Sequence, residues 1–305
     1  MTSAAQAAKL ATMRVGGQSE VGKLLSVAVK PVGDAFRSAA AVERQWRELG
    51  YTAAPELSAA SAEYAAFLAL LGAAGVEVLR LPQDESVGLD SLYARDASVV
   101  CDAGVILCSM GKPQRRTEPA AQEAALRAAG APIRGRISGD GHLEGGDVCW
   151  IDGRTLAVGR GYRTNDAGIR QLRDLVAGCV DEVIVVPLPH WRGPEDVFHL
   201  MSIVSPIDHD LFLVYAPLLP VPFREALLAR RIELVEVPTS EFETLGCNVL
   251  AIAEREVLMV AGNPATRARL ERAGVTVHEF AGREICVKGG GGPTCLTRPL
   301  MREAI

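Results

Sequence analysis

The chain has 305 residues, of which 49% are hydrophobic and only 5% aromatic, so its core must be built mainly from Ala, Val, Leu and Ile. That length is ample for a buried core. The formal net charge of −5 argues against a nucleic-acid partner, because proteins that bind nucleic acid carry a basic surface.

No apolar run approaches the roughly 18 residues needed to span a bilayer, so no membrane association is predicted. Residues 1–20 contain Lys9 and no continuous apolar stretch, which predicts a flexible N-terminal tail rather than a signal peptide. The seven cysteines are irregularly spaced, and neither a CxxC pair nor an HExxH motif occurs. This pattern indicates free thiols in a reducing, cytoplasmic compartment, with no metal site and no cofactor.

In chain order, short β-branched runs alternate with Ala- and Leu-rich stretches. The runs predict strands over 24–29, 76–81, 98–100, 105–108, 155–158, 183–187, 211–215, 232–237, 249–253, 256–260 and 275–279. The Ala- and Leu-rich stretches predict helices over 38–49, 58–74, 119–129, 167–177, 222–230 and 264–273. Pro222 and Pro264 stand near helix starts, where a missing N–H is tolerated.

Three pairs of strands are separated by tight turns, as in SVVCDAGVILC, VCWIDGRTLAVG and NVLAIAEREVLMVAG. Turn residues between two apolar runs are typical of β-hairpins. A hairpin followed by a helix and another strand recurs about five times, which suggests repeated ββαβ units in an α/β fold. No Gly/Ser/Pro-rich linker divides the chain, so residues 21–305 are predicted to form a single domain.

Four segments could carry chemistry, although each has a plain structural explanation. Four glycines precede Cys295, so the backbone can approach a ligand closely, but a glycine hairpin would look the same. Glu144 and Asp147 flank two glycines, which also suits a turn or a metal site. His199 ends an apolar stretch like many buried core histidines, and Asp96 precedes a strand like many capping acids.

Taken together, the four segments fit one chemistry. A thiol, a histidine and at least two acids suit nucleophilic attack on a cationic carbon. A guanidinium is planar and rich in N–H donors, so carboxylates can hold its edges.

The order ARD…LEGGDV…HL…GGGGPTC, from about residue 26 to residue 299, resembles the guanidino-group-modifying (pentein) superfamily. That superfamily includes dimethylarginine dimethylaminohydrolases, arginine deiminases, arginine dihydrolases and, more distantly, amidinotransferases. The resemblance implies five ββαβ units around a pseudo-fivefold axis, an α/β propeller with the site at its centre. It also implies a small guanidino substrate and the possibility of a homodimer.

The resemblance further implies residue roles. Cys295 matches the nucleophile that forms an S-alkylthiouronium intermediate, and His199 matches the general acid and base. Asp96 and Glu144 match the acids that bind the guanidinium nitrogens. Arg115 and Arg163 match arginines that bind the substrate's α-carboxylate, and Asp90 matches a nearby acid of the substrate site. Asp147 is assigned to support of the loop and not to substrate contact.

Two positions depart from the dimethylarginine pattern or its relatives. Arg95 stands where dimethylarginine enzymes carry an acid, and Met201 stands where arginine deiminases and amidinotransferases carry one. An arginine beside Asp96 is expected to neutralise part of the acidic edge, which favours unmethylated arginine as the substrate. An amidinotransferase remains the alternative activity, and a non-enzymatic binding protein on the same scaffold is a third reading, disfavoured by the complete Cys–His–Asp–Glu set.

Overall fold

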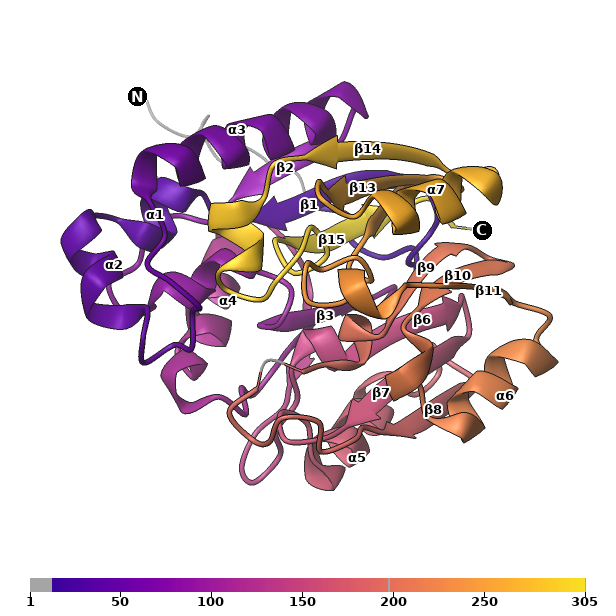
Figure 1. Ribbon diagram of the computed structural model, residues 1–305. Helices are drawn as coiled ribbons and strands as arrows, with labels where there is room; N and C mark the ends of the chain where they lie inside the picture. Colours follow the sequence, from indigo (N-terminus) through magenta and orange to yellow (C-terminus); the bar gives the residue numbers. More distant parts are fainter. Residues whose placement is uncertain (1–12, 197, 305) are drawn as a thin grey trace, which may run out of the picture.

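The structure is a computed structural model that describes residues 13–196 and 198–304. Its strands form five small sheets of three strands each, and the longer helices lie toward the outside of the molecule (Figure 1). The chain is therefore an α/β protein whose sheets repeat one pattern.

Four of the sheets follow the chain in order, and their strands are β3 (Ser98–Cys101), β4 (Gly104–Leu107) and β5 (Ile133–Arg136); β6 (Val148–Asp152), β7 (Thr155–Arg160) and β8 (Glu182–Pro187); β9 (Val204–Asp208), β10 (Leu211–Val214) and β11 (Glu233–Glu236); β12 (Leu250–Ala253), β13 (Glu256–Val260) and β14 (Thr276–Phe280). In each, the middle strand is antiparallel to the first strand and parallel to the third. A helix joins the second strand to the third, as a parallel connection requires. These helices are α4 (Glu118–Ala128), α5 (Asp166–Leu175), α6 (Val221–Ala229) and α7 (Pro264–Arg272).

The fifth sheet is shared between the two ends of the chain. Its middle strand, β1 (Leu24–Val29), is parallel to β2 (Glu77–Arg80) and antiparallel to β15 (Thr297–Arg302). Between β1 and β2 lie α1 (Val32–Phe36), α2 (Ala39–Gln45) and α3 (Leu57–Ala73). The last strand of the chain thus completes the first unit.

Helix α3 shows how the helices attach to the sheets. The Glu56 side chain accepts hydrogen bonds from the backbone at the helix start, which satisfies donors that have no partner within the helix. The buried residues Tyr64, Phe67 and Leu71 recur at helical spacing and form one face. Phe67 packs on Phe280 of β14, with ring centroids 5.1 Å apart. Burial of each such large side chain stabilises the fold by roughly 1.5–3 kcal/mol.

The three predicted hairpins are confirmed, as are the six predicted helices, with ends that differ by up to four residues. Three strands were not predicted, namely β5, β9 and β15, and β6 was predicted only as the first strand of its hairpin. Both β9 and β15 contain a proline, which argues against a central strand, and both lie at the edge of their sheet, where proline is tolerated. Among the described helices, none is both long and apolar enough to cross a membrane.

The expectation of a flexible tail over residues 1–20 is wrong for its last residues, while residues 1–12 lie outside the described residues. The Gly16 N–H donates to Leu300 O and the Arg302 N–H donates to Gly16 O, at 2.9 and 3.1 Å. Gln18 Nε2 donates to Gly153 O at 2.7 Å, and Glu20 is buried. Residues 16–20 are therefore attached to two different sheets.

Candidate active site

Five side chains of the candidate site come from equivalent places in the five sheets. Each lies a few residues before the first strand of its unit: Asp96 before β3, Glu144 before β6, His199 before β9, Asn248 before β12 and Cys295 before β15. Because the units repeat, this position recurs at the same end of every sheet. The repeated fold therefore brings together residues that are up to 199 positions apart in the sequence.

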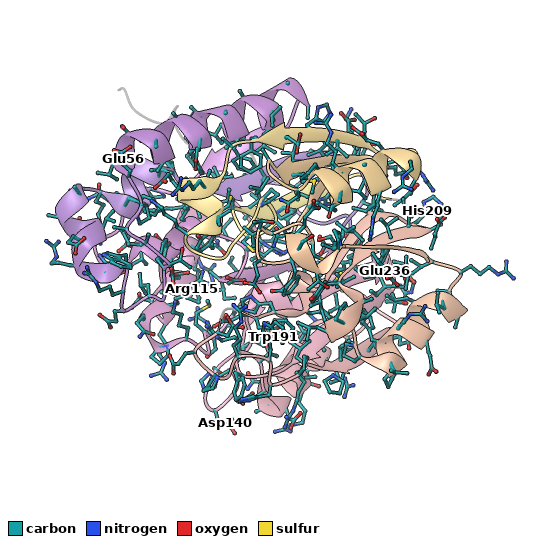
Figure 2. All side chains as sticks on the ribbon, in the orientation of Figure 1. Glu56, Arg115, Asp140, Trp191, His209 and Glu236 are labelled. Carbon is teal, nitrogen blue, oxygen red and sulfur yellow. The ribbon has the colours of Figure 1, made fainter. Side chains whose placement is uncertain are left out.

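The structure places all predicted site residues except Glu144 around one small pocket, whereas Glu144 is fully buried and reaches it through its hydrogen bond with His199. The pocket lining consists of Asp90, Tyr93, Asp96, Lys112, Arg115, Arg163, His199, Gly289, Gly291 and Cys295. In Figure 2, Arg115 lies toward the middle of the molecule, whereas Glu56, Asp140 and His209 lie near its outline. The pocket is thus central in the fold.

Glu144 and His199 form a buried acid–imidazole pair. Glu144 Oε2 is 2.7 Å from His199 Nε2, and Glu144 Oε1 accepts a hydrogen bond from the Lys112 backbone N–H at 3.0 Å. Burial alone would raise the pKa of Glu144, but the His199 hydrogen bond and nearby cations hold that pKa well below its usual range. Burial opposes the charged form of His199, yet the surrounding carboxylates raise the His199 pKa to about 9. His199 therefore carries a proton at neutral pH.

Asp147 supports the loop that carries His199. Its Oδ1 accepts a hydrogen bond from the Leu200 N–H at 3.0 Å, and its Oδ2 accepts one from Thr164 Oγ1 at 2.6 Å. Asp147 does not line the pocket, which agrees with a supporting part.

Asp96 and Arg115 form a second buried pair. Arg115 Nη1 donates to Asp96 Oδ2 at 2.5 Å, and Gly146 N–H donates to Asp96 Oδ1 at 2.9 Å. Arg115 also donates to both oxygens of Glu118, so most of its N–H groups are used within the protein. Burial raises the pKa of Glu118 to about 7 against the effect of Arg115. These contacts fix Asp96 at the edge of the pocket.

Asp90 and Arg163 lie on other sides of the same pocket. Asp90 Oδ2 is 2.6 Å from Lys112 Nζ, so the acid faces a cation that sequence reasoning missed. Arg163 Nη1 is 3.6 Å from Glu144 Oε2, and its Nη2 donates to Asp196 O at 3.2 Å. The pocket is therefore lined by both carboxylates and cationic side chains, and not by acidic groups alone.

Cys295 is partly exposed, and Asn248 Nδ2 donates to its sulfur at 3.3 Å. Burial, and then the Asp96 carboxylate, raise the pKa of the Cys295 thiol to about 11, whereas the Asn248 hydrogen bond lowers it. The thiol is therefore protonated at neutral pH when the pocket holds no ligand.

Two of the glycines near the site permit close packing of functional groups. A Cβ on Gly146 would lie 2.7 Å from both Asp96 Oδ1 and His199 Nδ1. A Cβ on Gly291 would lie 2.6 Å from the Tyr93 ring and 3.0 Å from Cys295 Cβ. At these two positions the absence of a side chain allows protein groups of the site to pack closely against each other.

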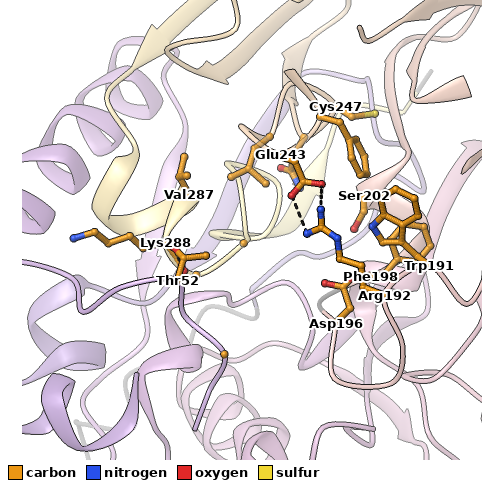
Figure 3. Close-up of a pocket in the computed structure, with 16 residues that line it drawn as sticks. Thr52, Trp191, Arg192, Asp196, Phe198, Ser202, Glu243, Cys247, Val287 and Lys288 are labelled. Atoms are coloured by element: carbon orange, nitrogen blue, oxygen red, sulfur yellow. Dashed lines mark hydrogen bonds and ion pairs between the residues drawn. The ribbon is translucent and has the colours of Figure 1, made fainter. Parts of the chain in front are cut away.

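A wider cavity adjoins the pocket and shares Gly289 with it (Figure 3). Trp191 and Arg192 lie on one side of this cavity, and Arg192 forms two hydrogen bonds with Glu243, at 2.6 and 3.0 Å. Asn248, which contacts Cys295, also lines it. A ligand can therefore approach the thiol through this cavity.

Asp96, Glu144 and His199 offer three ligand atoms within 4.8 Å of one another, a geometry that could hold a metal ion. However, Glu144 and His199 already share a hydrogen bond, and Arg115 occupies one oxygen of Asp96. The donor set is used within the protein, so we assign no metal to it.

Arg95 was expected to neutralise part of the acidic edge around the guanidinium, but it does not line the pocket. Its side chain lies in a turn before β3 and pairs with the buried Glu20 at 2.5 Å. Met201 is buried in the hydrophobic core around β9 and β10. Neither residue lines the pocket, so the preference for unmethylated arginine loses its basis.

Three contributors to the site were not predicted: Lys112, Glu118 and Asn248. Asn248 had a usable signal, since it precedes the first strand of the fourth hairpin as Asp96 precedes β3. Lys112 lies in the segment between β4 and α4, and Glu118 is the first residue of α4; no local sequence pattern indicates that they contact Asp90 and Arg115.

Known proteins resemble the chain in sequence and in fold. The N(G),N(G)-dimethylarginine dimethylaminohydrolase of Streptomyces coelicolor is 33% identical over 241 residues, which cover 77% of this chain and 83% of that protein. The dimethylarginine dimethylaminohydrolase of Pseudomonas aeruginosa, a mutant complexed with citrulline, superposes with a TM-score of 0.72 at 23% identity, covering 90% of this chain and 98% of that one. The N-terminal domain of ArgZ, a cyanobacterial arginine dihydrolase bound to product, gives a TM-score of 0.78 at 19% identity, covering 93% and 100%.

The fold, the pocket and these similarities define a hydrolase of the pentein superfamily that acts on C–N bonds of guanidino groups. The profile of the family described as "N,N dimethylarginine dimethylhydrolase, eukaryotic" matches residues 36–302. The chain belongs to this family.

Proposed function

We propose that the protein hydrolyses the guanidinium group of an N-methylated arginine, with Cys295 as the nucleophile. The observation that carries the proposal is the meeting of Cys295, Asp96 and His199 around one pocket, with the buried Glu144 hydrogen-bonded to His199. The choice of a methylated substrate is supported by the family and by the Streptomyces relative.

The proposed reaction has two halves. The thiolate of Cys295 attacks the guanidinium carbon, and His199 gives its proton to the departing amine as the C–N bond breaks. This leaves an S-alkylthiouronium on Cys295. His199 then takes a proton from water, and the resulting hydroxide attacks the same carbon. The C–S bond breaks, and the proton of the new hydroxyl passes to the leaving sulfur, which releases a citrulline-type product and restores the Cys295 thiol.

The protonation states of His199 and Cys295 in the free site support this order of proton transfers. His199 starts protonated, as an acid for the amine must, while Cys295 starts as a thiol. A guanidinium beside Cys295 adds a positive charge to the pocket, which favours the thiolate. The substrate's own charge therefore helps to generate the nucleophile.

The rest of the substrate is assigned to the other charged groups of the pocket. Asp96 and Glu144 hold the guanidinium nitrogens by charge-assisted hydrogen bonds. Arg163 is the principal partner of the α-carboxylate, with Arg115 contributing its remaining Nη1 donor. Asp90, paired with Lys112, faces the α-amino group. We also infer that the five units surround the site about a pseudo-fivefold axis.

An amidinotransferase is the second candidate activity. It needs an amine acceptor in place of water, and the acid expected after the histidine is here Met201, which is buried in the core. The missing acid, together with the LEGGDV motif at residues 143–148, favours the hydrolase over the amidinotransferase.

The test is a comparison of kcat/KM for asymmetric dimethylarginine, arginine and agmatine, with citrulline, ornithine, ammonia and dimethylamine measured as products. We expect dimethylarginine to be preferred and to give dimethylamine and citrulline. Agmatine should be poor because it lacks the carboxylate. Cys295→Ser should lose about 10³-fold or more of the activity, since a serine hydroxyl is far less ionised than a thiol.

A preference for arginine would overturn the methylated substrate but keep the hydrolase. Ornithine together with ammonia would indicate a second hydrolysis. Turnover only when an amine acceptor is present would replace the hydrolase by an amidinotransferase, and a Cys295→Ser variant with more than a tenth of the activity would remove Cys295 as nucleophile.

A further inference from the structure

Three buried arginines surround a second, separate cavity on the side of Arg95 that faces away from the catalytic pocket. Arg298 and Arg302 project from β15, and Arg95 precedes β3. All three are at most 5% exposed. Glu20 is the acidic side chain among the residues that line this cavity.

Much of the hydrogen-bonding capacity of these arginines is unused. Arg302 donates to Gly22 O and Ala251 O at 2.7 and 2.8 Å, and Arg95 donates to Glu20. Among the side chains of the described residues, Nε and Nη1 of Arg95, Nε and Nη2 of Arg298 and Nε of Arg302 are buried without a partner. Native proteins rarely bury donors in this way unless water or an ion accepts from them.

The cavity also carries uncompensated charge. Three guanidinium groups face one carboxylate, so the lining has two positive charges in excess. Burial, and then the neighbouring Arg95, lower the pKa of Arg298 to about 9. Asp96 is close in sequence to Arg95, but its oxygens accept from Arg115 and Gly146. A buried charge without a partner is strongly destabilising.

The size of the cavity limits what can supply the missing negative charge. Its volume is about 20 Å³, room for roughly one water-sized sphere. Sulfate, phosphate and carboxylates are too large. The cavity shares Gln18, Ser19, Glu20 and Trp150 with a larger neighbouring cavity, which gives a small ion a way in.

We propose that this cavity, between Arg95, Arg298 and Arg302, binds one monoatomic anion of the size of chloride. The anion accepts hydrogen bonds from the unpartnered N–H groups of Arg95 and Arg298 and offsets part of the excess positive charge. The proposal does not depend on the proposed function, because its readouts are ion binding and stability.

The test measures thermal unfolding of the full chain at constant ionic strength, with gluconate replaced stepwise by chloride. We expect Tm to rise by a few degrees and to saturate, because an ion that binds only the folded state stabilises it by mass action. Sulfate at the same ionic strength should not reproduce the rise. Arg298→Met should lose the chloride dependence, whereas Arg283→Met, at an arginine side chain that is 83% exposed, should keep it.

A second measurement keeps the proposal testable if Arg298→Met does not fold. Crystals of the unmodified protein grown or soaked in bromide should show one anomalous peak within hydrogen-bond distance of Arg298 and Arg95. Water at that position, with equal Tm in chloride and gluconate, would overturn the proposal. A Tm that rises without saturation, and equally in both variants, would show general screening and would also overturn it.

Discussion

At the scale of single residues, the site is held in the protonation state that precedes the reaction. Burial raises the pKa of the Cys295 thiol to about 11, and the carboxylates around His199 raise its pKa to about 9. At neutral pH Cys295, the proposed nucleophile, is therefore a neutral thiol, while His199, the proposed acid, carries its proton. Such a site does not expose a reactive thiolate before a cation arrives, which protects it from oxidation.

This state predicts the pH dependence of thiol labelling in the free protein. Iodoacetamide reacts with the thiolate, so labelling of Cys295 should be slow at pH 7 and rise about tenfold per pH unit toward pH 11. Asn248→Ala removes a hydrogen bond that stabilises the thiolate, so the pKa should rise and labelling at a given pH should slow further. Mass spectrometry of the Cys295 peptide measures the rate. A plateau near pH 8 in the unmodified protein would contradict the raised pKa.

The same raised pKa has a consequence for stability. The folded thiol pKa lies above its ordinary value of 9.0, so the thiol favours the folded state below pH 9. That contribution is lost as the pH rises through about 11. Cys295→Ser should therefore flatten the alkaline decline of stability.

At the scale of elements, the site depends on how closely the segments before the strands approach each other. The segment before β6 passes between Asp96 and His199, and Gly146 is the residue in contact with both. Its backbone N–H also donates to Asp96. A side chain at this position would push the acid and the imidazole apart.

Gly146→Ala should therefore lower kcat/KM strongly, by roughly 100-fold, because small misplacements of catalytic groups can cost that much. Its matched control is Gly153→Ala in the turn of the same β6–β7 hairpin, where a Cβ would meet no atom within 4 Å. The control should keep both activity and Tm. Equal activity in the two variants would show that the packing around Gly146 does not position the site.

Much of this element scale could be predicted from sequence, because hairpin turns and helical spacing are local signals. The recurring hairpins predicted repeated ββαβ units from the sequence alone. Four sequence motifs predicted Cys295, His199, Glu144 and Asp96 as site residues. The direction of the Arg95 side chain could not be predicted, since Arg95 lies in a turn without regular side-chain alternation and only its packing with the distant Glu20 decides where it lies. The same holds for the contact of Lys112 with Asp90, which joins residues across an irregular segment.

At the scale of the whole molecule, the two ends of the chain share one sheet. Strand β15 pairs with β1, and Gly16 is hydrogen-bonded to Leu300 and Arg302. The segment around Gly16 thus lies beside β15 and runs parallel to it, in the same sheet region as β1. Homodimer formation stays a prediction.

A circular permutant tests how far the units form one body. Joining the ends by a short Gly/Ser linker and opening the exposed loop between Gly139 and Asp140 should leave Tm within a few degrees and kcat/KM within about tenfold, because such sites tolerate new termini. The comparison is a chain ending at residue 296, which lacks β15 and should fail to fold. A permutant that is insoluble or inactive would show that the native ends are needed for more than this sheet.

The closure of the first sheet by the last strand also sets a timetable for synthesis. As the nascent chain leaves the ribosome, β1 emerges with one edge open, and its partner β15 follows only more than 260 residues later. Pairing across such a sequence distance is slow and leaves an edge that chaperones can cover in the meantime. Cys295 stands two residues before β15. The thiol is therefore put in place only when β15 pairs with β1, so a chain that stops short of β15 has no site in which the proposed nucleophile can act.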